Sequence, residues 1–146
     1  MCKMKLSTRS EYACLALIDL AENYYKGLIK IKDISQRKGI PQKYLEQILL
    51  SLKRGGFLRS KRGVEGGYRL ATSPDKISIA QIIRLMDGPI APVDSVSRYF
   101  FDHRPIEKSK ELQKLFREIR DIISDKLEKI SFADISNIKP PPEKKG

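Results

Sequence analysis

The sequence predicts a mostly α-helical fold with one small β-hairpin and a long helix near the C-terminus. Two short amphipathic segments, residues 31–39 and 41–52, meet at Gly39 and are expected to form a pair of helices. A glycine-rich stretch with basic residues, 57–71, follows directly and has the composition of a hairpin. Residues 107–130 then repeat apolar side chains at spacings of three and four, which is typical of a long amphipathic helix.

The charge of the chain is concentrated in its first half. The 146 residues carry a net charge of +11, and residues 1–73 hold 15 basic and 6 acidic side chains. Such an excess favours a polyanionic partner, nucleic acid first and an anionic membrane surface second, over a merely solvated surface. No apolar run approaches the ~20 residues that span a membrane, and no signal peptide follows the first methionine. We therefore expect a cytoplasmic protein.

The chain has few residues that could hold a metal. Cys2 and Cys14 are its two cysteines, and His103 is its single histidine. Two thiols in a basic chain without a signal peptide fit a reducing compartment. A zinc site needs further ligands at close spacing, so we expect no metal site. Cys14 falls on the apolar side of the first predicted helix, where we expect it to pack rather than react.

The first predicted helix begins at Ser7, a suitable N-cap, and should end near Gly27. Its apolar residues lie on nearly every face of the helix. The helix should therefore be buried on more than one side or also contact a partner subunit. A short helix from Ile31 is closed by Gly39. Pro41 should be the first residue of the next helix, where its missing N–H costs nothing.

That next helix, residues 41–52, has one apolar and one polar face, and Gly55-Gly56 should end it. Its apolar stripe consists of Leu45, Ile48, Leu49 and Leu52. Helix, glycine turn and helix form the helix-turn-helix pattern, whose second helix can enter the major groove of DNA. An ordinary corner between two helices gives the same spacing, so this pattern alone leaves both interpretations open.

The hairpin favours DNA binding. Its strands are expected at 57–61 and 68–71, with glycines supplying the turn between them. A helix-turn-helix followed directly by a basic hairpin predicts a winged helix-turn-helix. Arg62 at the wing tip would reach phosphate or a narrow minor groove, where negative potential is enhanced. Four further cations surround this position, namely Lys53, Arg54, Arg59 and Lys61.

The C-terminal part is expected to hold the subunit contact. Ser78 should cap a helix over 79–86, residues 87–89 should end it, and residues 90–105 should form a loop. A helix over 107–130 would extend on the order of 36 Å, more than a small core needs, so its apolar stripe predicts a partner helix in a second subunit. A helix packed only on its own domain is the alternative. The expected dimer contacts are Leu112, Leu115, Phe116, Ile119, Ile123 and Leu127.

These elements divide the chain into three parts. Residues 1–88 are expected to form the winged helix-turn-helix DNA-binding domain. Residues 89–135 would hold the loop and the dimerisation helix, with 131–135 capping the end of that helix. Residues 136–146, rich in proline and lysine, would form a disordered tail.

Several of these segments together resemble the Rrf2 family of bacterial winged-helix transcription regulators. The matching residues are Leu6-Ser7-Thr8-Arg9-Ser10-Glu11-Tyr12-Ala13, Ile34-Ser35, Gly39-Ile40, Tyr44-Leu45-Glu46-Gln47-Ile48 with Leu52, Arg62-Gly63 with Gly66-Gly67-Tyr68, and Asp87-Gly88-Pro89-Ile90. The resemblance covers about residues 4–135 and implies a homodimer, built on the long helix, that binds palindromic operators. It implies DNA contacts at Pro41, Gln42, Lys43, Tyr44, Glu46, Arg59, Lys61 and Arg62.

The chain departs from the family in one respect. Cluster-binding members carry three cysteines in the loop before the long helix, whereas residues 90–105 contain none. Without thiolates little can hold a [2Fe–2S] cluster, so we expect no cofactor. The resemblance then implies regulation through a partner protein or a small-molecule effector, as in the family's cysteine-metabolism repressors.

The expected function is therefore a sequence-specific transcription regulator, a repressor that acts on double-stranded DNA as a homodimer, in sulfur, cysteine or iron–sulfur metabolism. The alternative is a winged-helix module that binds protein without specific DNA binding. An enzyme is not expected, because the sequence shows no paired carboxylates, no nucleophile with a histidine and no phosphate loop.

Overall fold

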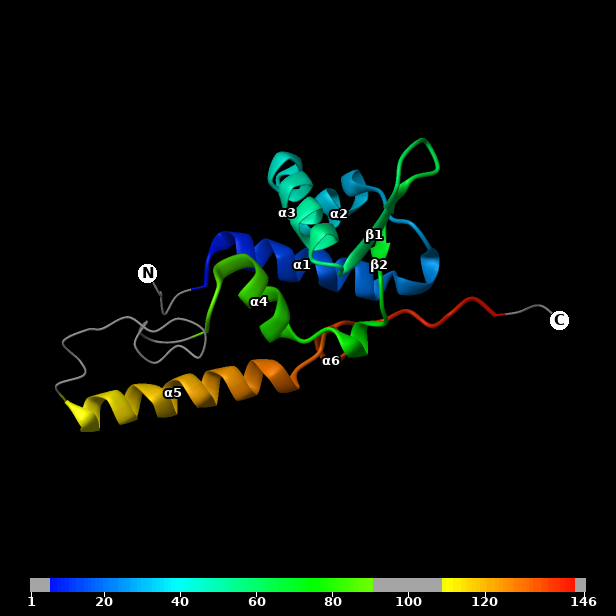
Figure 1. Ribbon diagram of the computed structural model, residues 1–146. Helices are drawn as coiled ribbons and strands as arrows, with labels where there is room; N and C mark the ends of the chain where they lie inside the picture. Colours follow the sequence, from blue (N-terminus) through cyan, green and yellow to red (C-terminus); the bar gives the residue numbers. More distant parts are fainter. Residues whose placement is uncertain (1–5, 91–108, 144–146) are drawn as a thin grey trace.

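The computed structural model describes residues 6–90 and 109–143. Within them the fold is mostly helical with one two-stranded antiparallel sheet, as predicted (Figure 1). The elements in chain order are α1 (Thr8–Glu22), the 3-10 turn η1 (Tyr24–Lys26), α2 (Ile31–Lys38), α3 (Gln42–Arg54), β1 (Leu58–Lys61), β2 (Gly67–Leu70), the 3-10 turn η2 (Pro74–Lys76), α4 (Ile79–Asp87), α5 (Lys110–Lys129) and α6 (Phe132–Ile135).

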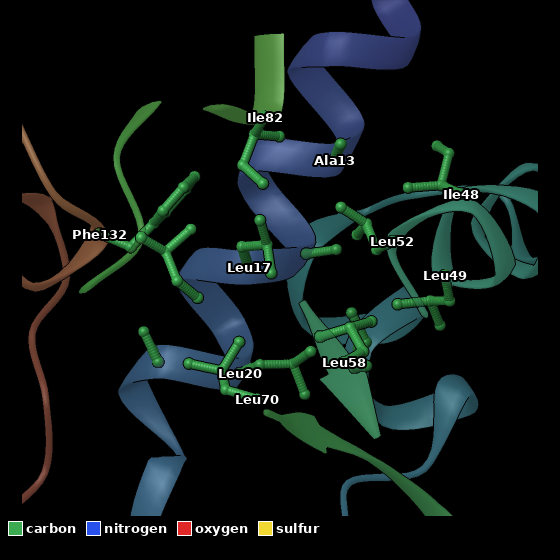
Figure 2. Close-up of a cluster of buried hydrophobic side chains, with 14 of the residues drawn as sticks. Ala13, Leu17, Leu20, Ile48, Leu49, Leu52, Leu58, Leu70, Ile82 and Phe132 are labelled. Atoms are coloured by element: carbon green, nitrogen blue, oxygen red, sulfur yellow. The ribbon is translucent and has the colours of Figure 1, made fainter. Parts of the chain in front are cut away.

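Helix α1 runs through the centre of the core. Ala13, Ala16 and Leu17 are completely buried, and side chains from α3, the wing strands, α4 and α6 surround the helix (Figure 2). The helix ends at Glu22, earlier than the predicted end near Gly27. Asn23 is the C-cap of the helix, and its side-chain amide donates to the same Asp19 carbonyl oxygen that its backbone N–H bonds. Only the short turn η1 continues toward the glycine.

The N-terminus of α1 is tied to the C-terminus of α4 by one carboxylate. Asp87 accepts hydrogen bonds from the backbone N–H of Ser7 at 3.0 Å, from the Ser7 hydroxyl, and from the Ser10 hydroxyl at 2.8 Å. A negative charge at this position also complements the positive end of the α1 dipole. The bonds join residues almost eighty positions apart and fix α4 against α1.

Replacing Asp87 with asparagine should lower stability at neutral pH and make it less sensitive to acid. Burial alone would raise the pKa of Asp87, but the bonds from Ser7 and Ser10 and the charge of Arg9 outweigh it and lower that pKa. Such a carboxylate stabilises the fold above its unfolded pKa of about 3.9, and the contribution is lost as pH falls through the lowered folded value. Thermal unfolding should show a gap between wild type and variant at pH 7 that narrows as the pH falls below the unfolded pKa of about 3.9 and through the lowered folded pKa.

The control for this prediction is Asp75→Asn, which removes the same charge from an exposed position in η2. Asp75→Asn should change the midpoint of thermal unfolding little, both at pH 7 and in acid. An Asp87→Asn gap of equal size at pH 7 and in acid would contradict the assigned role.

The end of α5 returns the chain to the core. Ser109 caps α5, which begins at Lys110, whereas the predicted helix began at residue 107. Residues 107 and 108 lie outside the described ranges. After α5 the Ile130 carbonyl accepts from the N–H of Ile79 at 3.0 Å, and the N–H of Phe132 donates to Ile77 at 3.0 Å. The completely buried Phe132 then enters the core, so 131–135 does more than cap a helix.

The segment expected as a disordered tail contacts α1 in its described part, through residue 143. The N–H of Asn137 donates to the Glu22 carboxylate at 3.2 Å, and the N–H of Lys139 donates to the Glu22 carbonyl at 3.2 Å. The expected loop, apart from Ile90, lies outside the described residues, and so do Cys2 and His103. The helices of the described ranges include none long and apolar enough to cross a membrane. The proposed three-part division stays a prediction.

Candidate nucleic-acid interface

The turn between α2 and α3 has the predicted geometry. Gly39 adopts a left-handed conformation with φ of 67°, which a residue with a side chain rarely takes. The N–H of Ile40 donates to the carbonyl of Ser35 at 3.2 Å, and the Ser35 hydroxyl donates back to the Ile40 carbonyl at 2.6 Å. Pro41 is the N-cap of α3 rather than its first residue, so the prediction was one position early.

Helix α3 buries one face and presents the other to solvent. The predicted apolar stripe of Leu45, Ile48, Leu49 and Leu52 is buried against α1 and the wing (Figure 2). The residues expected to meet DNA are all exposed, namely Pro41, Gln42, Lys43, Tyr44 and Glu46. No side chain caps the N-terminus of α3. Its first amides and its polar face are therefore directed to solvent, an arrangement suited to phosphate and base edges.

The wing is a regular hairpin whose base is anchored in the core. Leu58 pairs with Leu70, and both are buried, while Arg59, Lys61 and Arg62 are exposed as predicted. The tip projects away from the helices (Figure 1).

A third segment of backbone extends the wing alongside β2. Ile29 exchanges two hydrogen bonds of 2.8 Å with Tyr68 of β2. A side chain on Gly67 could not be accommodated there, because its Cβ would lie 2.5 Å from the Ile29 carbonyl oxygen. The glycine therefore permits the contact that holds the wing to the segment before α2.

One wing residue that the sequence analysis did not select is Arg69. It lies directly opposite Arg59 in the sheet, and both are exposed. Like charges at paired positions destabilise a hairpin unless an anion approaches them. The available signal was the expected hairpin, because the pairing of its two strands places these two arginines on one face.

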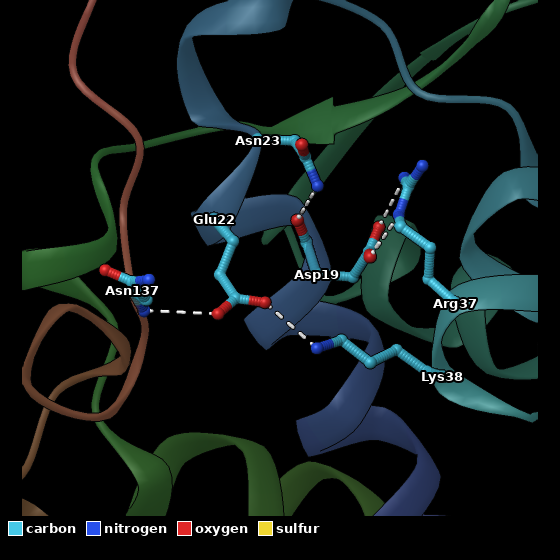
Figure 3. A network of polar contacts seen from close by, with 6 residues as sticks. All are labelled: Asp19, Glu22, Asn23, Arg37, Lys38 and Asn137. Atoms are coloured by element: carbon cyan, nitrogen blue, oxygen red, sulfur yellow. Dashed lines mark hydrogen bonds and ion pairs between the residues drawn. The ribbon is translucent and has the colours of Figure 1, made fainter.

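A buried carboxylate fixes the orientation of the helix-turn-helix. Asp19 in α1 is 1% exposed and accepts two hydrogen bonds from the Arg37 guanidinium in α2, at 2.7 and 2.9 Å (Figure 3). Lys38 adds an ion pair to Glu22 at 2.9 Å. Bidentate pairs of this kind define both position and angle. The only signal in the sequence was one acidic residue inside the apolar run of the first helix.

A groove of about 370 Å³ lies beside the exposed face of α3. It is lined by Thr8, Arg9, Tyr12, Tyr44, Gln47, Ile48, Leu50, Ser51 and Arg54. Arg9 reaches across from α1 and donates to the Ser51 hydroxyl at 2.8 Å, while the rings of Tyr12 and Tyr44 lie 6.4 Å apart. Positive and hydroxyl groups of α1 thus lie next to α3, the helix expected to enter the major groove of DNA. Sequence reasoning did not connect these two helices.

The chain has few residues of the kinds that hold a [2Fe–2S] cluster. Such clusters take Cys or His ligands, four in all, and the sequence has two cysteines and one histidine. Cys14 is partly buried against the core, and burial, followed by the charge of Asp87, raises the pKa of its thiol to about 11. A protonated thiol is a poor ligand. Across residues 6–90 and 109–143, no group of three His, Cys, Asp or Glu side chains could hold a metal ion.

Helix α5 leaves much of its apolar face exposed. Leu112, Leu115 and Ile123 are 41%, 49% and 39% exposed. Of the other predicted dimer contacts, Phe116 and Ile119 are half-buried, and Leu127 packs partly against the subunit's own core. Ile122, which was left out of the predicted set, is the most exposed of the apolar residues on this helix at 70%.

The face that α5 turns toward α4 is a different one. Ser124 is buried, and Glu128 forms an ion pair with Arg84 of α4. At about 100° per residue, Leu115 lies roughly half a turn round the helix from Ser124. The exposed apolar side chains are therefore not those that pack on α4.

A helix-turn-helix whose second helix, α3, exposes a polar face beside a basic wing defines a DNA-binding transcriptional regulator. Comparison with known proteins agrees, and the matching family and relatives are transcriptional regulators, not enzymes. The Rrf2 family, described as an iron-dependent transcriptional regulator, matches residues 6–138. The chain belongs to the Rrf2 family.

Several relatives share most of this length. The transcriptional regulator CymR of Bacillus subtilis is 33% identical over 134 residues, which cover 92% of this chain and 91% of CymR. IscR of Aliivibrio salmonicida is 40% identical over 87 residues, covering 60% of this chain and 52% of that protein. The solved structure of CymR, the global cysteine regulator of B. subtilis, is similar with a TM-score of 0.75 and 31% identity. The match covers 94% of this chain and 99% of the CymR chain. IscR of T. potens covers 90% of this chain and 85% of its own, with 30% identity and a TM-score of 0.70.

Proposed function

We propose that this regulator is a repressor that binds a palindromic operator as a homodimer. The main observation behind this proposal is that two separate surfaces are exposed to solvent. One is the polar and basic face of α3 together with the wing, and the other is the apolar face of α5. A two-fold pair of subunits joined through α5 would present two reading helices, and a two-fold protein matches a palindromic site.

We also propose a role in sulfur or cysteine metabolism, with iron–sulfur metabolism as the second candidate. Similarity to CymR over 92% of the chain supports the first, and similarity to IscR of Aliivibrio salmonicida over 60% of the chain supports the second. The misfit of the cysteines supports regulation without a bound cluster. The signal would then reach the protein through a regulatory protein partner or a small-molecule effector.

Selection of bound duplexes from a random pool tests this proposal. The expected result is enrichment of one palindrome, with an affinity that falls steeply as salt rises, because several phosphates are contacted. Repeating the selection with candidate sulfur metabolites should change the yield of the same palindrome. Recovery of no palindrome, together with an affinity indifferent to salt, would overturn the proposal and favour a protein-binding module.

Replacing Arg62 with alanine should weaken binding to the selected operator by about ten- to hundredfold and leave the thermal transition unchanged. The side chain is exposed at the wing tip, so its loss removes a DNA contact without disturbing the core. Glu65→Ala is the matched control, since it truncates an exposed residue of the same tip and removes a negative charge. Fluorescence anisotropy measures both. An Arg62→Ala protein that binds like wild type would remove the wing tip from the interface.

A further inference from the structure

A second basic surface lies outside α3 and the wing tip. It surrounds a groove of about 580 Å³ between the end of α1 and the start of α2. The lining consists of Asn23, Lys26, Leu28, Ile29, Lys30, Lys32, Asp33, Gln36 and Arg37. The lining holds four cations and one carboxylate, and because Arg37 is paired with the buried Asp19, the excess positive charge comes from the three lysines. We call this surface the α2 groove.

The α2 groove is continuous with the wing. Ile29, in its lining, is the residue whose backbone pairs with Tyr68 of β2. Lys30 follows immediately and is exposed, and Lys32 is exposed on the first turn of α2. A polyanion that contacts the wing beside Tyr68 would therefore lie close to these lysines.

The groove has one cation held by the core and three exposed lysines at its edge. Arg37 is held by its two bonds to the buried Asp19, so its position is set by the core (Figure 3). The lysines have long, exposed side chains and no ion pair is formed by Lys26, Lys30 or Lys32 among residues 6–90 and 109–143. Flexible ammonium groups of this type suit phosphate contacts that carry no sequence information.

The C-terminal segment adds a further positive charge beside the groove. The N–H of Lys139 is bonded to the Glu22 carbonyl, which brings this residue next to the end of α1. The nearby Lys139 ammonium, followed by Arg37, a like charge, lowers the pKa of Lys26. Like charges held this close repel one another, and an anion placed between them removes that repulsion.

We propose that the α2 groove binds the phosphate backbone of duplex DNA beyond the base pairs that α3 reads. The inference rests on the proposed operator binding and extends it to the flanks of each half-site. A duplex is favoured over a small anionic ligand because the groove is open, its cations are exposed at the surface, and it continues the wing. The contact would lengthen the footprint of each subunit and increase affinity on all sequences alike.

A triple variant, Lys26→Gln with Lys30→Gln and Lys32→Gln, tests the proposal in the full-length protein. Its affinity is measured against salt on two duplexes, one carrying the selected palindrome with long flanks and one trimmed to the palindrome. On the long duplex, the negative slope of log binding constant against log salt should be less steep for the triple variant than for wild type, by about 2 to 3 for each bound subunit. Each lost phosphate contact reduces the steepness by roughly 0.9. On the trimmed duplex, wild type and variant should bind alike.

The control is Lys110→Gln with Lys114→Gln and Arg117→Gln, which removes the same charge from exposed positions of α5. It should leave both slopes unchanged, and both variants should keep the wild-type thermal transition. If wild type selects no palindrome, the proposed function itself fails. If wild type binds but the triple variant has the same slope on both duplexes, or loses affinity equally on both, the flanking contact is overturned. Saturable binding of inorganic phosphate that the triple variant lacks, with an unchanged DNA slope, would assign the groove to a small anion instead.

Discussion

Replacing Phe132 with alanine should lower the free energy of unfolding by about 3 to 5 kcal/mol, the range for truncating a large buried aromatic side chain. Phe132 is fully buried in α6, and its backbone N–H donates to the carbonyl of Ile77. The substitution removes a ring from among side chains of α1 and α4 and leaves a cavity that these helices can fill only in part (Figure 2).

The predicted loss also has a functional consequence. Phe132 stands just after α5, so it anchors the helix expected to join the subunits to the domain expected to bind DNA. Chemical denaturation of the purified protein measures the change, and the control is Ile135→Ala in the same short helix, where the side chain is 46% exposed. The control should cost less than about 1 kcal/mol. A Phe132→Ala protein as stable as this control would show that α6 does not complete the core.

The elements that the sequence predicted well are those set by neighbouring residues. The stripe of α3, the glycine turn at Gly39 and the alternation of the wing each depend on a few adjacent positions. Ser78 was likewise recognised as a cap, and it forms a complete capping box with Gln81. Periodicity and turn chemistry act over one or two helical turns, so a single sequence is enough to find them.

The features that sequence reasoning missed depend on residues far apart in the chain. Asp19 gives no sign in the sequence that Arg37 is its partner, and Asp87 gives none that it caps α1. Phe132 was taken as part of a helix cap, because nothing local shows that α6 folds back under α1. Such contacts follow from the packing of helices, which propensity and pattern do not encode. The predicted DNA contacts were all found exposed, but exposure does not test binding, so they stay predictions.

The predicted DNA-binding surface and the exposed apolar face of α5 lie on opposite sides of α1 (Figure 1). The exposed cations of α3 and the wing lie on one side of α1, and α5 lies on the other side, beyond α4 (Figure 1). A partner subunit on α5 would therefore leave the basic surface free. The same separation explains why a substitution on α5 can test assembly without altering a DNA contact.

Replacing Leu115 with aspartate should weaken the association of two subunits by at least about a hundredfold, because a charge would enter an apolar seam twice in each dimer. Leu115 is 49% exposed in the isolated subunit and points away from the buried Ser124, so the subunit itself should remain folded. Sedimentation equilibrium should give a monomer at concentrations where wild type is a dimer. Operator binding should fall with it, since a single reading helix makes half of the contacts.

The matched control is Lys114→Asp, an exposed position on the same helix about 100° round from Leu115. It also places an aspartate on α5 but outside the apolar stripe, and it should sediment as wild type does. Thermal unfolding distinguishes dissociation from unfolding, because a folded monomer keeps a cooperative transition. A Leu115→Asp protein that remains a dimer at the same concentrations would place the subunit contact on another surface, and the apolar face of α5 would then need a different partner.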